Sequence, residues 1–301
     1  MDIESNGSDI VILGHLAKDI IEVDGKRYTS LGGAVFYGAI AGSHMGLKIT
    51  VITRLKEEDF PLLSIFKKNG ITYYAHTSEE TSGLRNIYSS KNMEFRDYKP
   101  LGFAGLFRKD EIPDFKPPPK FFVLGPIVAG EIDLELLKFI KKRFNNVCLD
   151  IQGFTRFRDN QKVFYSSLSF NEKGKILSNI DVLKLDQIEA KILTDHQTVD
   201  RAAEELIEFG PNEILITHEK GISVYNSNNS FHFPWKNKNS IGRTGRGDTA
   251  FISYLGARIS KNPEESLKFA AALTSLKMES PEPFNLPLDQ VESLIKREYS
   301  F

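Results

Sequence analysis

Short apolar runs bounded by turn residues alternate along this chain with segments whose apolar residues recur at helical spacing. Such runs are typical of buried strands, and the segments between them are typical of covering helices. The expected strands are Asp9–His15, Leu47–Leu55, Phe121–Pro126, Asn146–Asp150, Val182–Asp186 and Glu213–His218. The expected helices are Gly32–Gly46, 131–144, one starting at about Gln187, and Val199–Gly210. This alternation predicts an α/β fold: a doubly wound, mostly parallel sheet with helices on both faces.

Two stretches break that alternation. Residues Ile20–Ser30 surround Asp24-Gly25, a strong signal for a two-residue hairpin turn. Residues Ile71–Tyr98 alternate between apolar and polar without a helical period, which indicates strands. We expect a small β-sheet lid built from about residues 16–31 and 71–108, on a single domain spanning 1–301. The alternative is an edge hairpin with an irregular excursion.

Composition excludes several classes of protein. The chain has 39 Lys and Arg residues against 40 Asp and Glu, whereas proteins that coat nucleic acid usually carry a basic excess. The one cysteine, Cys148, cannot form an intrachain disulfide, and no CxxC pair is present to hold zinc. The start of the chain has no basic segment before an apolar core, and nowhere do 18 apolar residues follow one another. We therefore expect a cytoplasmic protein that binds neither nucleic acid nor membranes.

The most informative segment is GRTGRGDT, Gly242–Thr249, which precedes a helical pattern. Glycine lets backbone N–H groups turn toward one point, and a helix start adds unpaired N–H groups and a positive dipole end. Such a loop can hold a phosphate oxyanion. The carboxylate of Asp248 would repel a phosphate, so it does not suit a loop that only binds this anion. It does suit a reaction in which the carboxylate takes the proton of a hydroxyl that attacks the phosphorus. The segment therefore suggests phosphoryl transfer to an alcohol, and the simpler reading is that Asp248 only stabilises the helix start.

Other motifs of phosphate and nucleotide chemistry are absent from the sequence. There is no GxxxxGK[ST] phosphate loop, and no GxGxxG follows the first strand. The GxSxG and HExxH motifs of hydrolases are missing too.

Three motifs in order resemble the ribokinase-like (PfkB) carbohydrate kinase family. The first is Leu31–Ala39, where Gly-Gly opens a helix of small residues; the second is Asp186–Glu189, which is similar to an NxxE element; the third is GRTGRGD itself. The resemblance extends from about Asp9 to Glu279. It implies an enzyme that moves the γ-phosphate of ATP to a hydroxyl of a small sugar, polyol or nucleoside, with Mg²⁺.

The resemblance also implies roles for individual residues. Asp248 is expected to be the general base, and the N–H groups of Gly245, Arg246 and Gly247 are expected to form the anion hole. In the substrate site, Asp19 would accept hydrogen bonds from hydroxyls, and Gly32 and Gly33 would let the substrate approach the backbone. Glu189 would hold Mg²⁺ through water. The nucleotide-binding residues would be Asp186, Thr217 and Gly221.

This sequence also departs from the family pattern. Gly242 stands where the family often has an Asp that, in ribokinase, helps to hold a monovalent cation, so potassium activation is not expected. Ala17 and Tyr37 replace two Asn residues that would grip sugar hydroxyls, which argues against ribose. Tyr37 could instead flank a substrate ring. Arg246 replaces a small residue, and its guanidinium could reach the phosphates or point to solvent.

One further segment bears on the substrate. Leu149–Arg156 follows a predicted strand, so Gln152 and Arg156 lie at the carboxyl edge of the sheet, where open α/β sheets bind ligands. Both are expected to contact substrate or phosphate. The stretch is similar to one in relatives that include inositol kinases, so a cyclic polyol such as inositol is the leading acceptor. A nucleoside kinase, or a non-catalytic regulator that binds sugar or nucleotide, is the alternative, and a homodimer through the lid is possible in either case.

Overall fold

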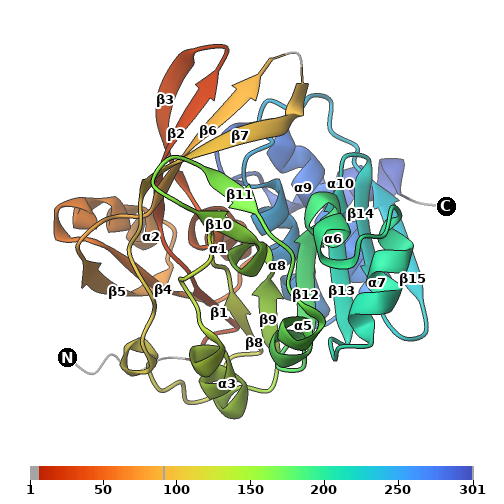
Figure 1. Ribbon diagram of the computed structural model, residues 1–301. Coiled ribbons are helices and arrows are strands. Elements are labelled where there is room, and N and C mark those ends of the chain that lie inside the picture. Colours follow the sequence, from red (N-terminus) through yellow and green to blue (C-terminus); the bar gives the residue numbers. More distant parts are fainter. Residues whose placement is uncertain (1–6, 91, 300–301) are drawn as a thin grey trace.

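The computed structural model describes residues 7–90 and 92–299 (Figure 1). Its main sheet has nine strands in the order β15-β14-β13-β12-β9-β8-β1-β4-β5. All neighbouring strands from β13 to β5 are parallel, whereas β14 and β15 are antiparallel. The strands of this sheet are β1 Ile10–Leu13, β4 Ile49–Lys56, β5 Thr72–Ser78, β8 Phe121–Leu124, β9 Val147–Asp150, β12 Val182–Asp186, β13 Glu213–His218, β14 Gly221–Tyr225 and β15 Ser230–Pro234.

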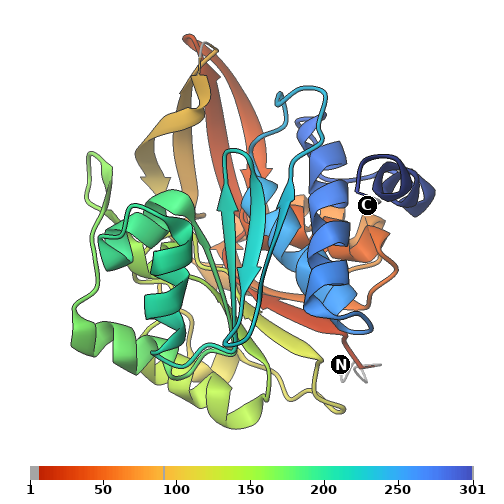
Figure 2. The ribbon, with the colours of Figure 1, turned by 90° about the vertical axis from the view of Figure 1, so that its right-hand side faces the viewer.

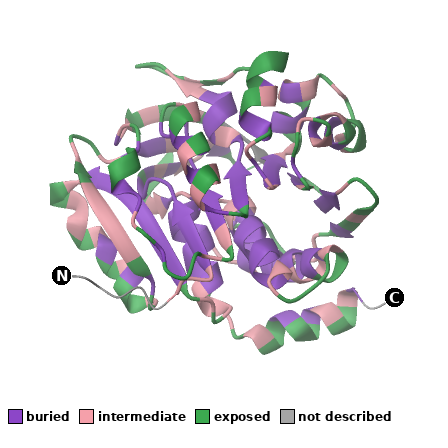
Figure 3. Cartoon of the chain, turned by 90° about the horizontal axis from the view of Figure 1, so that it is seen from below, coloured by how far each residue is buried: buried purple, intermediate pink, exposed green. Residues whose placement is uncertain are grey.

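Helices cover both faces of this sheet, as Figure 2 shows. One face packs against α1 Ala34–His44, α8 Arg246–Arg258, α9 Pro263–Met278 and α10 Leu288–Glu298. The other packs against α3 Leu134–Arg143, α5 Phe170–Leu177, α6 Gln187–Thr194 and α7 Val199–Ile207. Strand β1 is apolar and buried along its whole length because both of its faces are covered. Figure 3 shows this buried interior, and the predicted doubly wound fold is confirmed.

A second, four-stranded sheet with the order β3-β2-β6-β7 stands above the main sheet in Figure 1; we call it the lid. Its strands are β2 Ala17–Val23, β3 Lys26–Gly32, β6 Gly83–Ser89 and β7 Asn92–Gly102. Asp24 and Gly25 both have positive φ, 47° and 83°, which gives the hairpin turn that the sequence predicts.

The prediction was wrong for the first strand of the second lid segment. Residues 72–78 form β5, which pairs with β4 in the main sheet, so that segment of the lid comprises only residues 83–102. The physical reason is burial on both faces: Tyr73 packs against one core and Tyr74 against the other. Alternation alone cannot distinguish an edge strand of the main sheet from a lid strand.

Shorter elements complete the described chain. They are α2 Ser64–Lys68, α4 Gln152–Thr155, the 3₁₀ helices η1 Glu57–Leu63 and η2 Lys109–Glu111, and the hairpin β10 Arg156–Arg158 with β11 Val163–Tyr165. Cys148 lies in β9 at the centre of the sheet and is fully buried. Among the described residues, no helix combines the length and the apolar character that crossing a bilayer requires.

Candidate active site

The site lies at the carboxyl edge of the main sheet, beneath the lid. Strand β1 sits between β4, the next strand of this sheet along the chain, and β8, which follows β5 in the chain and lies on the other side of β1. Such a switch point opens a crevice between the loops that follow the strands. The turns after β8 and β9 contribute Ile127 and Gln152, and the start of α8 contributes Asp248.

Two adjoining pockets occupy this crevice. The first, which we call the basic pocket, has Arg156, Lys184, Arg243 and Arg246 on its wall. The second, the lid pocket, is lined by Asp19, Gly32, Tyr37, Asn86 and Tyr98 among others. Both pockets share Gln152, Arg156, Gly245 and Asp248. Asp248 therefore stands where the two pockets meet.

The start of α8 places Asp248 and the backbone amides together. Gly245 precedes the helix with φ 80°, and Asp248 lies half-buried in the first turn. A side chain on Gly245 would collide with the Tyr37 ring, because its Cβ would lie 2.2 Å from that ring. Only glycine adopts this positive φ readily and also leaves room for the Tyr37 ring, so the loop depends on Gly245.

The amides of this loop are not all directed to the basic pocket. The N–H of Arg246, predicted as one anion-hole donor, instead donates to the carbonyl of Arg243 at 3.1 Å. Within the described part of the chain, the amides of Gly245 and Gly247 have no backbone acceptor. Those two N–H groups, together with the positive end of α8, are the donors an oxyanion would meet.

The side chain of Arg246 is buried on the wall of the basic pocket. Its guanidinium carbon lies 5.8 Å from the centre of the Trp235 ring, within range of a cation–π contact. Of the two orientations considered from the sequence, the one that points to solvent does not fit this buried side chain.

Lys184 is a further cation of the basic pocket that the sequence analysis did not identify. Its buried ammonium donates to Oδ2 of Asp150 at 2.7 Å, from one strand to its neighbour. Burial lowers the pKa of Lys184, but the carboxylate of Asp150, followed by Glu189 and Asp248, outweighs burial and raises it. A Cβ on Gly247 would lie 2.9 Å from this ammonium, so the charge sits directly beside the glycine pair.

Asp186 and Glu189 form a reciprocal cap at the start of α6. Oδ1 of Asp186 accepts from the amide of Glu189, and Oε2 of Glu189 accepts from the amide of Asp186, each within 3 Å. Burial and the neighbouring Asp186 raise the pKa of Glu189 to about 8, against the opposing effect of Lys184 and Arg156.

The same pair bears on metal binding. Oε1 of Glu189 lacks a hydrogen-bond partner among the described residues and lies 3.6 Å from Arg156. That oxygen fits a water molecule of a Mg²⁺ shell, since Mg²⁺ prefers oxygen ligands and keeps several waters. The described residues contain no cluster of three acidic, His or Cys side chains that could enclose a metal. Most ligands of such an ion would have to be water and phosphate.

Asp19 lies on the wall of the lid pocket and joins two lid strands. Its Oδ1 accepts from the amide of Leu84 at 2.8 Å, and Asn86 Nδ2 lies 3.4 Å from its Oδ2. A Cβ on Gly32 would approach Oδ2 of Asp19 to 2.4 Å, so this glycine makes room for the carboxylate. Gly33 has φ 89° and faces the carbonyl of His15, which leaves no room for a side chain.

Tyr37 supports the loop before α8. The residue is 2% exposed, and its ring lies between Gly245 and the ammonium of Lys277, 4.8 Å from the ring centre. Its hydroxyl oxygen is 3.5 Å from Ser30 Oγ in the lid hairpin. The ring is thus packed under the loop, although its edge lines the lid pocket.

The remaining predicted residues fall in different places. Gln152 and Arg156 line both pockets, and Arg156 donates to the carbonyl of Ile127. Thr217 is the last residue but one of β13 and lies on the wall of the basic pocket. Gly221 lines neither pocket: it lies in β14, where a Cβ would be 2.3 Å from the carbonyl oxygen of Phe233 in β15.

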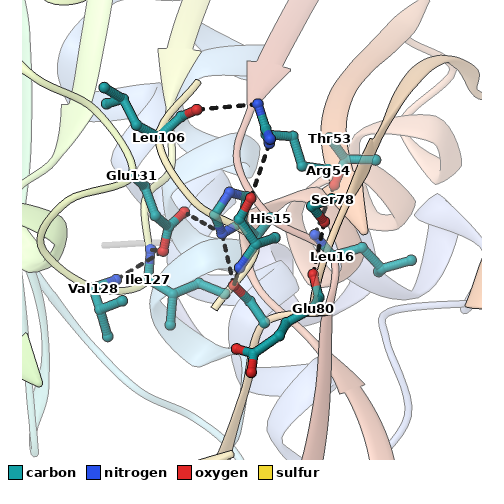
Figure 4. Close-up of polar contacts among 12 residues, drawn as sticks. His15, Leu16, Thr53, Arg54, Ser78, Glu80, Leu106, Ile127, Val128 and Glu131 are labelled. Carbon is teal, nitrogen blue, oxygen red and sulfur yellow. Dashed lines mark hydrogen bonds and ion pairs between the residues drawn. The ribbon is translucent and has the colours of Figure 1, made fainter. Parts of the chain in front are cut away.

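A buried polar network supports the lid pocket from behind (Figure 4). Oε1 of Glu131 accepts from the amides of Ile127 and Val128, and Oε2 lies 3.3 Å from Nδ1 of His15. The same nitrogen of His15 is 2.7 Å from Ser82 Oγ at the foot of the lid. This network fixes the turn after β8 to the strands that carry Asp19 and Asn86.

Comparisons with known proteins agree with this geometry. Among solved structures, a pyrophosphate-dependent kinase in the ribokinase family, in complex with sulfate, is 31% identical; the match covers 94% of this chain and 99% of that one, with a TM-score of 0.86. A pyrophosphate-dependent kinase in that family, complexed with a pyrophosphate analog and myo-inositol, is 30% identical over the same shares of the chains, with a TM-score of 0.85.

Among curated proteins, a cytidine kinase of Thermococcus kodakarensis is 27% identical over 269 residues, which are 85% of this chain and 91% of that protein. No family model matches the chain.

Proposed function

The chain belongs to the ribokinase family of kinases, and we propose that Asp248 is the general base that activates the hydroxyl group of its acceptor. The observation that carries this proposal is the position of Asp248 at the junction of the basic pocket and the lid pocket. A hydroxyl held in the lid pocket and a phosphate held in the basic pocket would meet beside that carboxylate.

The transfer follows from this arrangement. The acceptor oxygen forms a bond to phosphorus as the bond to the leaving phosphate oxygen breaks, and the hydroxyl proton passes to Asp248. The amides of Gly245 and Gly247 and the ammonium of Lys184 stabilise the negative charge on the transferred group. These groups are fixed by the fold, so little reorganisation is needed when the charge develops.

Magnesium is part of the proposal. Bound Mg²⁺ would neutralise phosphate charge and hold the donor in place. Glu189 would orient a water of the ion through Oε1, and Asp186 would hold Glu189 in position through the reciprocal cap.

For the acceptor we propose a small polyol. The lid pocket is compact and presents Asp19, Asn86, Gln152 and Arg156, which suit closely spaced hydroxyl groups. A relative at 30% identity is complexed with myo-inositol, and a relative at 27% is a cytidine kinase. Inositol is therefore the first acceptor to test, and cytidine is the second.

We infer the class of phosphate donor from the charged side chains of the basic pocket. Four cationic side chains line this pocket beside three acidic ones, and this excess of cations favours a donor whose charge is concentrated on two phosphates. Pyrophosphate is used by the relatives at 30–31% identity, whereas the resemblance seen in the sequence predicted ATP. We propose pyrophosphate as the first donor to test and ATP as the second.

The activity test pairs each donor with each acceptor in the presence of Mg²⁺, with the phosphate ester detected by phosphorus NMR. Asp248→Asn should lower kcat by about 10²–10⁴-fold, because the base is lost while both pockets remain. Asp289→Asn is the matched control, since Asp289 also lies in a helix first turn but outside both pockets. It should keep wild-type turnover.

Two results would contradict the proposal. Turnover by Asp248→Asn close to that of the wild type would remove Asp248 as the base. Binding of donor and acceptor without any ester product would instead favour a non-catalytic regulator.

A further inference from the structure

Lys277 is a buried cation beneath the loop that leads into α8. The residue lies near the end of α9, is 1% exposed, and donates to the carbonyl oxygens of Gly242, at 2.5 Å, and Thr244. Its ammonium also faces the Tyr37 ring. Both hydrogen bonds that this ammonium donates to described residues thus go to backbone oxygens, and an aromatic face covers it from another side.

This surrounding is unusual for a lysine and typical of a small bound cation. Burying an ammonium is costly, and the cost is offset only by close and well-directed partners. Carbonyl oxygens that converge on one point are the ligands that fixed sites offer to monovalent cations. Lys277 therefore brings together two carbonyls that would otherwise repel each other.

We propose that Lys277 is a positioning residue: a tethered ammonium that takes the place of a bound monovalent cation and holds loop 242–245 so that the amides of Gly245 and Gly247 face the basic pocket. This inference rests on the proposed function of those amides. Lys277 lines neither the basic pocket nor the lid pocket, so it acts through the loop.

Other contacts show how firmly the loop is tied to this point. The amide of Gly242 donates to the carbonyl of Met278 at 2.9 Å, next to Lys277 on α9. Gly245 rests on the same Tyr37 ring that faces the ammonium. Thr244 Oγ1 is 2.9 Å from the hydroxyl of Tyr88 in the lid, so a shift of the loop would also reach the lid.

The carboxylates of Asp248 and Glu282 favour a cation at this position, but burial outweighs them and lowers the pKa of Lys277 to about 7. A small pocket lined by Tyr37, Gly242, Thr244 and Glu282 opens beside the loop. A small cation could enter by this route if the lysine side chain were removed.

The inference leads to a rescue experiment. Lys277→Ala should lower kcat at least 100-fold, because the anion-hole amides are displaced, and it should also raise KM for the acceptor, because Thr244 and Gly245 of the same loop line the lid pocket. Potassium or propylammonium at 100 mM should restore kcat of this variant at least tenfold. The wild type, which carries its own cation, should respond to neither.

Two variants make the result specific. Lys173→Ala is the matched control, because Lys173 is buried and donates to the carbonyl of Leu193, remote from both pockets. Lys173→Ala should be less stable than the wild type but keep its kcat, and neither potassium nor propylammonium should change that kcat. Lys277→Met keeps the volume but not the charge, so it should lose kcat and resist rescue, since no space is left for a cation.

The inference is overturned if Lys277→Ala retains wild-type kcat, or if folded Lys277→Ala is inactive and neither cation restores it. If the alanine variant does not fold, full turnover by Lys277→Met would overturn it equally. A second readout separates this inference from the proposed function: potassium should raise the unfolding temperature of Lys277→Ala, and not that of the wild type, even if no acceptor is phosphorylated. The absence of such a shift would also count against it.

Discussion

At the scale of single residues, the pair of His15 and Glu131 carries a pH dependence. Both side chains are fully buried. Burial raises the pKa of Glu131 to about 7, despite the opposing hydrogen bonds from the amides of Val128 and Ile127. Burial, with Arg54 nearby, lowers the pKa of His15 to about 3, so the imidazole stays neutral where Glu131 titrates.

The raised pKa of Glu131 determines whether this group makes the protein more or less stable as the pH rises. Between pH 4.5 and 7 the unfolded chain has lost this proton and the folded chain still holds it, so this group makes stability fall as the pH rises. Glu131→Gln removes the titration, and its free energy of unfolding should gain about 3 kcal/mol relative to the wild type across that window. Urea unfolding at pH 4.5 and 7.5 measures the difference, with Glu135→Gln as an exposed control. If the difference in free energy of unfolding between Glu131→Gln and the wild type is the same at both pH values, the pKa of Glu131 is not raised in the folded protein.

Residues also show where sequence-based prediction of the site reached its limit. Asp19, Gln152, Arg156 and Asp248 could be predicted because each lies within a motif or directly after a strand, and the structure brings them onto one pocket wall. Lys184 could not be predicted. Its role depends on Asp150 lying opposite it in the neighbouring strand, and that register is set by the order of strands in the sheet.

At the scale of elements, the loop before α8 depends on the conformation of one glycine. Gly245→Ala would place a methyl group against Tyr37 at φ 80°, whereas Gly46→Ala would place one in open space at φ 78°. Both substitutions carry the cost of positive φ, roughly 1–2 kcal/mol. Gly245→Ala should be less stable than this control by about 2 kcal/mol because of overpacking.

The same comparison should appear in activity. Displacing the loop removes anion-hole donors, so kcat of Gly245→Ala should fall about 10²-fold or more, while Gly46→Ala keeps wild-type kcat. Thermal unfolding and kcat measured on both variants provide the check. Equal losses of stability and of kcat in the two variants would mean that the contact of residue 245 with Tyr37 has no effect.

The elements themselves were largely predictable, and the exception has a physical cause. The Asp24-Gly25 turn and the helix after Gly33 follow from local chemistry, and both are present. Strand β5 was assigned to the wrong sheet because the sheet to which a strand belongs is decided by its pairing with other strands, here β4, and not by its own sequence pattern. Gly221 shows the same limit, since its neighbour Phe233 is brought close by β15.

At the scale of the whole molecule, the crevice is lined by residues of both the lid and the main sheet. The lid supplies Asp19 and Asn86, and the main sheet with its helices supplies Gln152 and Asp248. An acceptor bound in the lid pocket would therefore touch both sheets at once. The contact of Tyr88 with Thr244 gives the lid a second connection, to the loop that Lys277 holds.

The single thiol of the chain gives a way to follow the molecule as a whole. Cys148 lies in the central strand β9 with helices above and below, and burial raises its pKa. A thiol reagent should modify the native protein only as fast as the main sheet opens, and the denatured protein at once. Mass spectrometry of the adduct over time would give that opening rate without any engineered probe, and rapid labelling of the native protein would reveal an access route to the centre of the sheet.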